Sequence, residues 1–127
     1  REHELTVQGS PFVDIVENVV KIVVKVTNRS QIAWSSTDVN GGAYSVCLSF
    51  HSHNANGDVV VYDNDRSRFL FAIGPDDTNY VPVKVPLDQI RAGVRFVHLE
   101  MVQESVGWWG GGIMVEFDDE LMEEILG

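Results

Sequence analysis

Two adjacent tryptophans, Trp108 and Trp109, carry the most informative chemistry in the sequence. They lie in a glycine-rich run, with Gly107 before them and three glycines at 110–112 after them. Neighbouring side chains of an extended segment point to opposite faces, so a sheet core takes one ring and leaves the other exposed. We expect Trp109 to be exposed, because Trp108 continues the strand. A large exposed ring flanked by glycines is typical of a binding platform.

Polar side chains that could contact a ligand occur in two other segments. Ser49, His51 and His53 occupy alternate positions of one extended run and therefore share one face. Asp65 and Arg66 follow in a short run of acidic and basic residues. A carboxylate or a planar guanidinium binds vicinal hydroxyl groups through paired hydrogen bonds, and hydroxyl and imidazole groups add single ones.

Together, these residues predict a shallow groove for a carbohydrate, in which a sugar ring stacks on a tryptophan. The predicted site contains Ser49, His51, His53, Asp65, Arg66, Trp108 and Trp109. The rival arrangement is a structural cluster in which Arg66 pairs with Glu104 and both tryptophan rings are buried.

The spacing of the histidines supports a metal site only weakly. His51 and His53 have a spacing that zinc proteins use, and an acidic residue of the following hairpin could approach them. The acidic candidates are Asp58, Asp63 and Asp65. The sequence places no third ligand beside the two histidines, so we expect no metal ion and no cofactor.

Nothing in the sequence predicts catalysis. Glu100 and Glu104 form the one carboxylate pair in a strong strand pattern. Four residues of strand separate them by roughly 13 Å, which is too far for either glycosidase geometry. No nucleophile elbow, phosphate loop or dinucleotide fingerprint occurs, and Cys47 has no local motif that would activate its thiol. We therefore expect a binding domain and not an enzyme.

Composition narrows the class of protein. The chain has 127 residues, enough for one domain, with 9 basic against 19 acidic residues and a net charge of −10. Nucleic acids and anionic membranes are poor partners for such a chain. It has a single cysteine and no apolar run of about 20 residues. The single cysteine favours a reducing compartment, so we expect a cytoplasmic domain. Without a long apolar run, we expect no membrane insertion. Because the chain begins without Met, we interpret it as part of a longer protein.

Hydrophobic residues alternate along most of the sequence. Val20, Ile22, Val24 and Val26 share one face of the clearest strand, and Lys21 lies on the other. Similar segments are found at 5–7, 12–16, 44–53, 59–62, 80–85, 96–104 and 113–117. Seven to nine such strands without a long helical pattern predict an all-β antiparallel sandwich of immunoglobulin or jelly-roll type.

Helical periodicity is confined to residues 87–92 and 118–126, so a short C-terminal helix is expected. Leu121, Met122, Ile125 and Leu126 give that tail an apolar side. We expect the tail and the strand at 113–117 to form the interface of a twofold dimer. The alternative is a tail that folds back onto its own sandwich.

Five short motifs follow one another along the chain. They are VKVTNRS at 24–30, the strand and Asn-Gly-Asp turn at 46–60, Ile-Gly-Pro at 73–75, Val-Lys-Val-Pro at 83–86 followed by Ala92-Gly93, and the segment 99–109. Over about residues 10 to 117, the chain resembles the C-terminal carbohydrate-binding domain of Wzt-type proteins. Wzt-type proteins are the ATPase subunits of ABC transporters for O-antigen polysaccharides.

The resemblance implies a cytoplasmic β-sandwich that recognises the end of a lipid-linked glycan before export. It also implies a homodimer, often with an exchanged C-terminal strand, and a parent ATPase domain that is absent from this chain. The leading hypothesis is therefore a non-catalytic module for a neutral, O-antigen-like glycan, since an acidic protein repels acidic ones. The alternative is an immunoglobulin-like protein-interaction or dimerisation domain appended to a polysaccharide-assembly enzyme.

Overall fold

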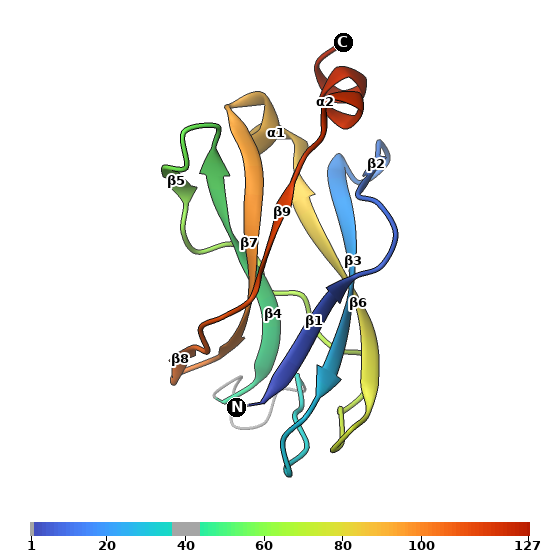
Figure 1. The fold of residues 1–127 in the computed structure, drawn as a ribbon, viewed down its shortest axis with the longest axis vertical. Coiled ribbons are helices and arrows are strands. Elements are labelled where there is room, and N and C mark those ends of the chain that lie inside the picture. The colour runs from blue at the N-terminus through green and yellow to red at the C-terminus, as the bar shows by residue number, and fades with distance from the viewer. Residues whose placement is uncertain (1, 37–43) are drawn as a thin grey trace.

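The computed structural model describes residues 2–36 and 44–127, and in this part nine strands form two antiparallel sheets (Figure 1). The first sheet contains β1 (His3–Val7), β2 (Phe12–Asp14), β3 (Val19–Asn28) and β6 (Thr78–Pro86). The second contains β4 (Val46–Asn54), β5 (Val59–Val61), β7 (Val94–Gln103), β8 (Gly107–Trp108) and β9 (Ile113–Glu116). Two short helices, α1 (Leu87–Arg91) and α2 (Asp119–Leu126), lie at one end. The predicted all-β sandwich with a short C-terminal helix is confirmed.

Strand β3 is the centre of the first sheet. It pairs with β6 along one side, while β1 and β2 share its other side. The predicted alternation is confirmed, because Val20, Ile22, Val24 and Val26 are fully buried in the core. Lys21 points away from the core and forms an ion pair of 2.9 Å with Asp14.

The pairing of β4 with β7 organises the second sheet. Leu48 and Phe50 on β4 lie opposite Met101 and Leu99 on β7, and all four side chains fill the space between the sheets. The residues that alternate with them, such as Ser49 and His51 on β4 and Glu100 on β7, therefore point to the outer face of the sheet. Strand β5 extends the sheet beyond β4, and β8 and β9 share the free side of β7. Of the predicted site residues, this outer face carries Ser49, His51 and His53.

The C-terminal segment packs against its own sandwich. The Asp118 carboxylate caps α2 by accepting a hydrogen bond of 2.8 Å from the backbone N–H of Leu121. Phe117 and Leu121 are both buried in the main core, and α2 contacts α1 and β2. Phe117 and Leu121 are therefore covered by their own chain, and the dimer through this segment remains a prediction. Across the described ranges, neither helix has the length and hydrophobicity needed to cross a membrane.

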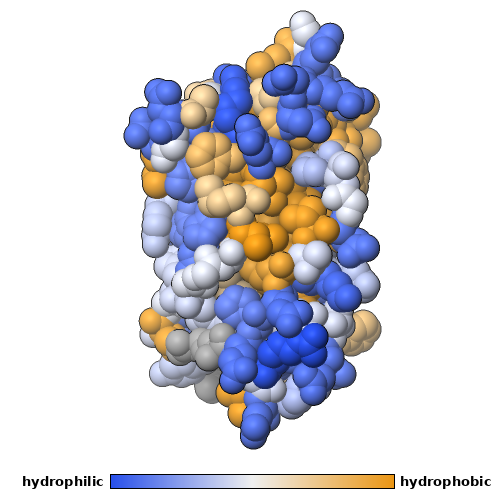
Figure 2. Space-filling model, in the orientation of Figure 1, coloured by the Kyte–Doolittle hydropathy of each residue, from blue (hydrophilic) through white to orange (hydrophobic). Residues whose placement is uncertain are grey.

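The core is incompletely covered on one side of the sandwich. Figure 2 shows hydrophobic residues at the surface on the side where β1 and β9 lie. Leu5 and Val7 of β1 and Ile113 of β9 are only partly buried and pack against the core. On this face, part of the hydrophobic core therefore reaches the surface where β1 and β9 lie.

Cys47 should resist thiol reagents in the folded protein. Its side chain is fully buried, its Sγ lies 3.6 Å from Nη1 of Arg68, and burial raises the pKa of the thiol. The thiolate is the reactive species, so burial and the raised pKa both slow modification. We expect iodoacetamide to react at least about 100-fold more slowly than in the urea-unfolded chain. Equal rates in the two states would contradict the buried position.

Candidate functional site

The register between β4 and β7 builds the centre of the site. On the outer face, Ser49 lies opposite Glu100, and His51 lies opposite His98. Directly opposite residues of an antiparallel pair have their Cβ atoms about 5 Å apart. The sheet therefore brings together two residues of the predicted site and two that the sequence did not place there.

The segment 62–68, which follows β5, covers part of this face. Its backbone pairs with the edge of β4 through Ser67, whose N–H donates to the Leu48 carbonyl at 2.7 Å. The hydroxyl of Ser49 is fully buried and donates to the carbonyls of Asn64 and Asp65 at 3.0 and 2.9 Å. Ser49 therefore anchors this segment, and the expectation that it faces a ligand is wrong. Asp65 itself is exposed at the rim.

The two tryptophans point to opposite faces, as expected, but the assignment is reversed. The Trp108 ring centroid lies 4.2 Å from that of His51, and Cζ of Arg66 lies 5.1 Å from the Trp108 centroid. Trp109 instead packs 5.0 Å from Trp34 and contacts the main core. The cause is pairing, because Trp108 lies opposite Val102, which is on the outer face of β7. Placing Trp109 beside His51 and Arg66 was therefore wrong, and Trp108 takes that position.

Arg66 is held by two carboxylates. Its Nε donates to Glu104 at 2.7 Å and its Nη1 donates to Asp63 at 2.6 Å. Burial works against the charge, but these two partners outweigh it and raise the pKa of Arg66. The predicted rival pairing of Arg66 with Glu104 is thus present, although Trp108 and Trp109 both remain partly exposed. The Arg66 guanidinium lies over the Trp108 ring in a cation–π contact, which helps to hold that ring in place.

His51, whose ring contacts Trp108, forms a polar cluster with His98 and Glu100. Nε2 of His51 lies 3.1 Å from Oε1 of Glu100, and both side chains are buried. His98 is half-buried, and each of the three residues brings one potential ligand atom within 4.8 Å of the others. The sequence pattern already places His98 and Glu100 at alternate positions of one strand, on the face that points outward, and places His51 on the outward face of another strand. These residues lie close together because of the register between β4 and β7, which could not be predicted from the sequence.

His53 stands apart from this cluster. Its ring stacks on Phe96 with centroids 5.0 Å apart, and its Nδ1 lies 3.1 Å from the Gly57 carbonyl oxygen. The metal arrangement considered from the sequence, with His51 and His53 as a ligand pair, is therefore not formed. His53 instead helps to hold the β4–β5 turn.

A hollow continues the outer face toward α2. It has a volume of about 630 Å³, and Phe96, Met114 and Met122 give it an apolar wall. Arg95, Glu116 and Asp119 line it with charged groups. Because Met114 on β9 lies opposite His98, the hollow adjoins the polar cluster. Aromatic and apolar surface beside a few polar groups is typical of small-molecule sites.

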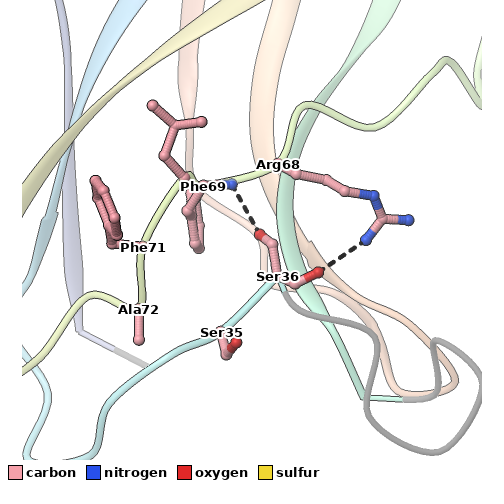
Figure 3. A pocket seen from close by; sticks show the side chains of 7 residues that line it. Ser35, Ser36, Arg68, Phe69, Phe71 and Ala72 are labelled. Atoms are coloured by element: carbon pink, nitrogen blue, oxygen red, sulfur yellow. Dashed lines mark hydrogen bonds between the residues drawn. The ribbon is translucent and has the colours of Figure 1, made fainter.

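A second hollow, of about 430 Å³, lies beside the segment that follows Arg68 (Figure 3). The Ser36 hydroxyl accepts a hydrogen bond of 3.0 Å from the N–H of Phe69, and its carbonyl accepts one of 3.1 Å from Arg68. Leu70 and Phe71, on the same segment, are 84% and 76% exposed. This apolar surface was not predicted from the sequence.

Comparisons with known proteins give the chain no relative. No protein-family model, curated protein or solved structure matches it. The function is therefore inferred from the chemistry of the outer face and from the sequence resemblance alone.

Proposed function

We propose that the chain is a non-catalytic carbohydrate-binding module whose glycan lies on the outer face of the β4–β7 sheet. The observation that carries this proposal is the concentration of rings beside polar groups on that face. Tyr62 and Trp108 both contact the ring of His51, and Phe96 lines the adjoining hollow. The apolar C–H face of a sugar stacks on such rings, while nearby polar groups bind its hydroxyls.

Rigid support suits Trp108 to this role. Its ring has His51 at 4.2 Å, Tyr62 at 5.7 Å and the Arg66 guanidinium at 5.1 Å, so its orientation is fixed before a ligand arrives. A side chain that is already ordered loses little conformational entropy on binding. Asp65, which precedes Arg66, has an exposed side chain that can accept hydrogen bonds from hydroxyl groups.

The resemblance to Wzt-type domains supports an O-antigen-like polysaccharide as the glycan. In this proposal the domain acts in the cytoplasm and recognises the glycan before export, as part of a longer protein and paired with a second copy. A net charge of −10 favours a neutral glycan over an acidic one.

A binding role without catalysis is supported by the state of the carboxylates. Glu100 accepts a hydrogen bond from the N–H of Gly110, and Glu104 accepts one from Arg66. Both carboxylates are thus committed to internal hydrogen bonds. A glycosidase needs two carboxyl groups that flank the scissile bond.

Replacing Trp108 by Ala should weaken glycan binding by about 10- to 100-fold, the usual cost of removing a central aromatic contact. A glycan array of bacterial polysaccharides identifies the ligand, and calorimetry then compares the variants. Trp109→Ala is the matched control, since Trp109 packs on the core. It should lower the melting temperature and leave the affinity of the folded protein near that of the wild type. A blank array, or a Trp108→Ala variant with unchanged affinity, would contradict the proposal.

An interaction domain is the second candidate, and one observation favours it. Leu70 and Phe71 are highly exposed and lie beside the hollow of Figure 3, and exposed apolar surface often marks a protein contact. The same array separates the two functions, because a domain that binds only protein leaves it blank.

A further inference from the structure

We propose that His51, His98 and Glu100 form a binding site for a divalent transition-metal ion, with Zn²⁺ as the best fit. Each residue brings one ligand atom within 4.8 Å of the others, so a small closure of the side chains places all three around one ion. The proposed glycan binding is not needed for this inference. The site concerns the interior of the cluster, beneath the surface on which a sugar would stack.

In each of the three side chains, one polar atom is hydrogen-bonded to a backbone group, which orients the side chain and leaves its second polar atom for a metal. Nδ1 of His51 donates to the Tyr62 carbonyl at 2.5 Å, which leaves Nε2 to coordinate. Nε2 of His98 donates to the Gly111 carbonyl at 2.6 Å, which leaves Nδ1. Metal-bound histidines almost always donate their second ring N–H in this way, which fixes the tautomer and the ring orientation.

The carboxylate follows the same rule. Oε2 of Glu100 accepts a hydrogen bond of 2.6 Å from the N–H of Gly110, so Oε1 is left to face His51. Gly110 and Gly111 thus orient two of the three ligands from one short loop. This gives the glycine run after the tryptophans a role in shaping the cluster.

The contact between His51 and Glu100 itself calls for a cation. With its proton on Nδ1, a neutral His51 presents a lone pair from Nε2 to the Glu100 oxygen 3.1 Å away. Two facing lone pairs repel, so a proton or a metal ion must lie between them. Both side chains are more than nine-tenths buried, which makes an unbalanced carboxylate costly.

The donor set selects the kind of ion. Two imidazoles and one carboxylate form a familiar zinc-binding set, whereas Ca²⁺ and Mg²⁺ prefer oxygen ligands alone. Three protein ligands leave a fourth position for water or for an oxygen of a bound molecule. The rings of Trp108 and Tyr62 around His51 form the apolar surroundings that limit solvent access to a metal.

Metal titration of the intact chain, first freed of metal with a chelator, tests this site. We expect calorimetry to show one Zn²⁺ bound per chain. Co²⁺ should give visible absorption bands of an ion bound by histidine nitrogens, and Ca²⁺ should give neither binding heat nor absorption. His98→Ala should weaken Zn²⁺ binding at least about 100-fold, since the loss of an outer hydrogen bond alone costs 10- to 100-fold. His53→Ala is the matched control, because that histidine lies on the same face outside the cluster.

Three outcomes would overturn the proposal: no cobalt spectrum in the wild-type chain, unchanged affinity in His98→Ala, or an equal loss in His53→Ala. A missing cobalt spectrum would mean that a proton, and not a metal ion, lies between His51 and Glu100. Melting curves in chelator check that each variant is folded. Should His98→Ala fail to fold, the cobalt spectrum of the wild-type chain decides alone. All these signals are measured without a glycan, so a failed glycan experiment does not affect them.

Discussion

Replacing Gly112 by Ala should destabilise the protein by at least about 3 kcal/mol, as the sum of backbone strain and overpacking. Gly112 has a φ of +84°, and a Cβ added there would lie 2.1 Å from the Leu99 carbonyl oxygen and 3.0 Å from Nε2 of His98. Leu99 is a fully buried residue of the paired strand β7, so its backbone has little room to move. The added methyl group must displace the chain just before β9 and weaken the β7–β9 pairing.

Gly110→Ala is the matched control for this prediction. Gly110 also has a positive φ, +79°, but a Cβ added there meets nothing within 4 Å. Backbone strain alone should cost about 1 kcal/mol. Urea denaturation of the two variants measures the difference, and equal losses would contradict the close approach at Gly112. Because Gly111 binds His98, Gly112→Ala should also disturb the histidine cluster, whereas Gly110→Ala should leave its ring contacts in place.

The sheets were largely predictable because their signal is local. Alternation along β3 and β4 identifies which residues enter the core from the sequence of each strand alone. Val24, Phe50 and Leu99 all occupy the predicted inner face. The C-terminal helix was predictable for the same reason, since its apolar residues repeat at helical spacing.

The site was less predictable because its contacts depend on register and on connections between strands. His51 meets His98 and Glu100 only because β4 and β7 pair in one particular alignment. The outward direction of Trp108 depends on a turn at 103–106, in which Ser105 has a φ of +65°. A one-residue change in that turn would exchange the faces of the two tryptophans. The burial of Ser49 likewise depends on the distant segment 62–68.

Phe50→Ala should lower the free energy of unfolding by about 3–5 kcal/mol, as expected when a large buried ring leaves a cavity. Phe50 is 1% exposed at the centre of β4 and belongs to the core between the two sheets. Neighbouring inner-face residues such as Leu99 are held in paired strands and cannot collapse fully into the space.

Phe96→Ala provides the comparison, because it removes the same ring from the other face of the same sheet. Phe96 is half-buried and stacks on His53, so its loss should cost only about 1 kcal/mol, the order of a single aromatic pair. Urea midpoints of the two variants measure the asymmetry between the faces. The inner face of β4 carries the stability of the fold, and the outer face is thereby left free to carry rings and polar groups that serve binding. Equal losses would show that both faces support the fold to the same extent, and that the outer face is not free for a ligand.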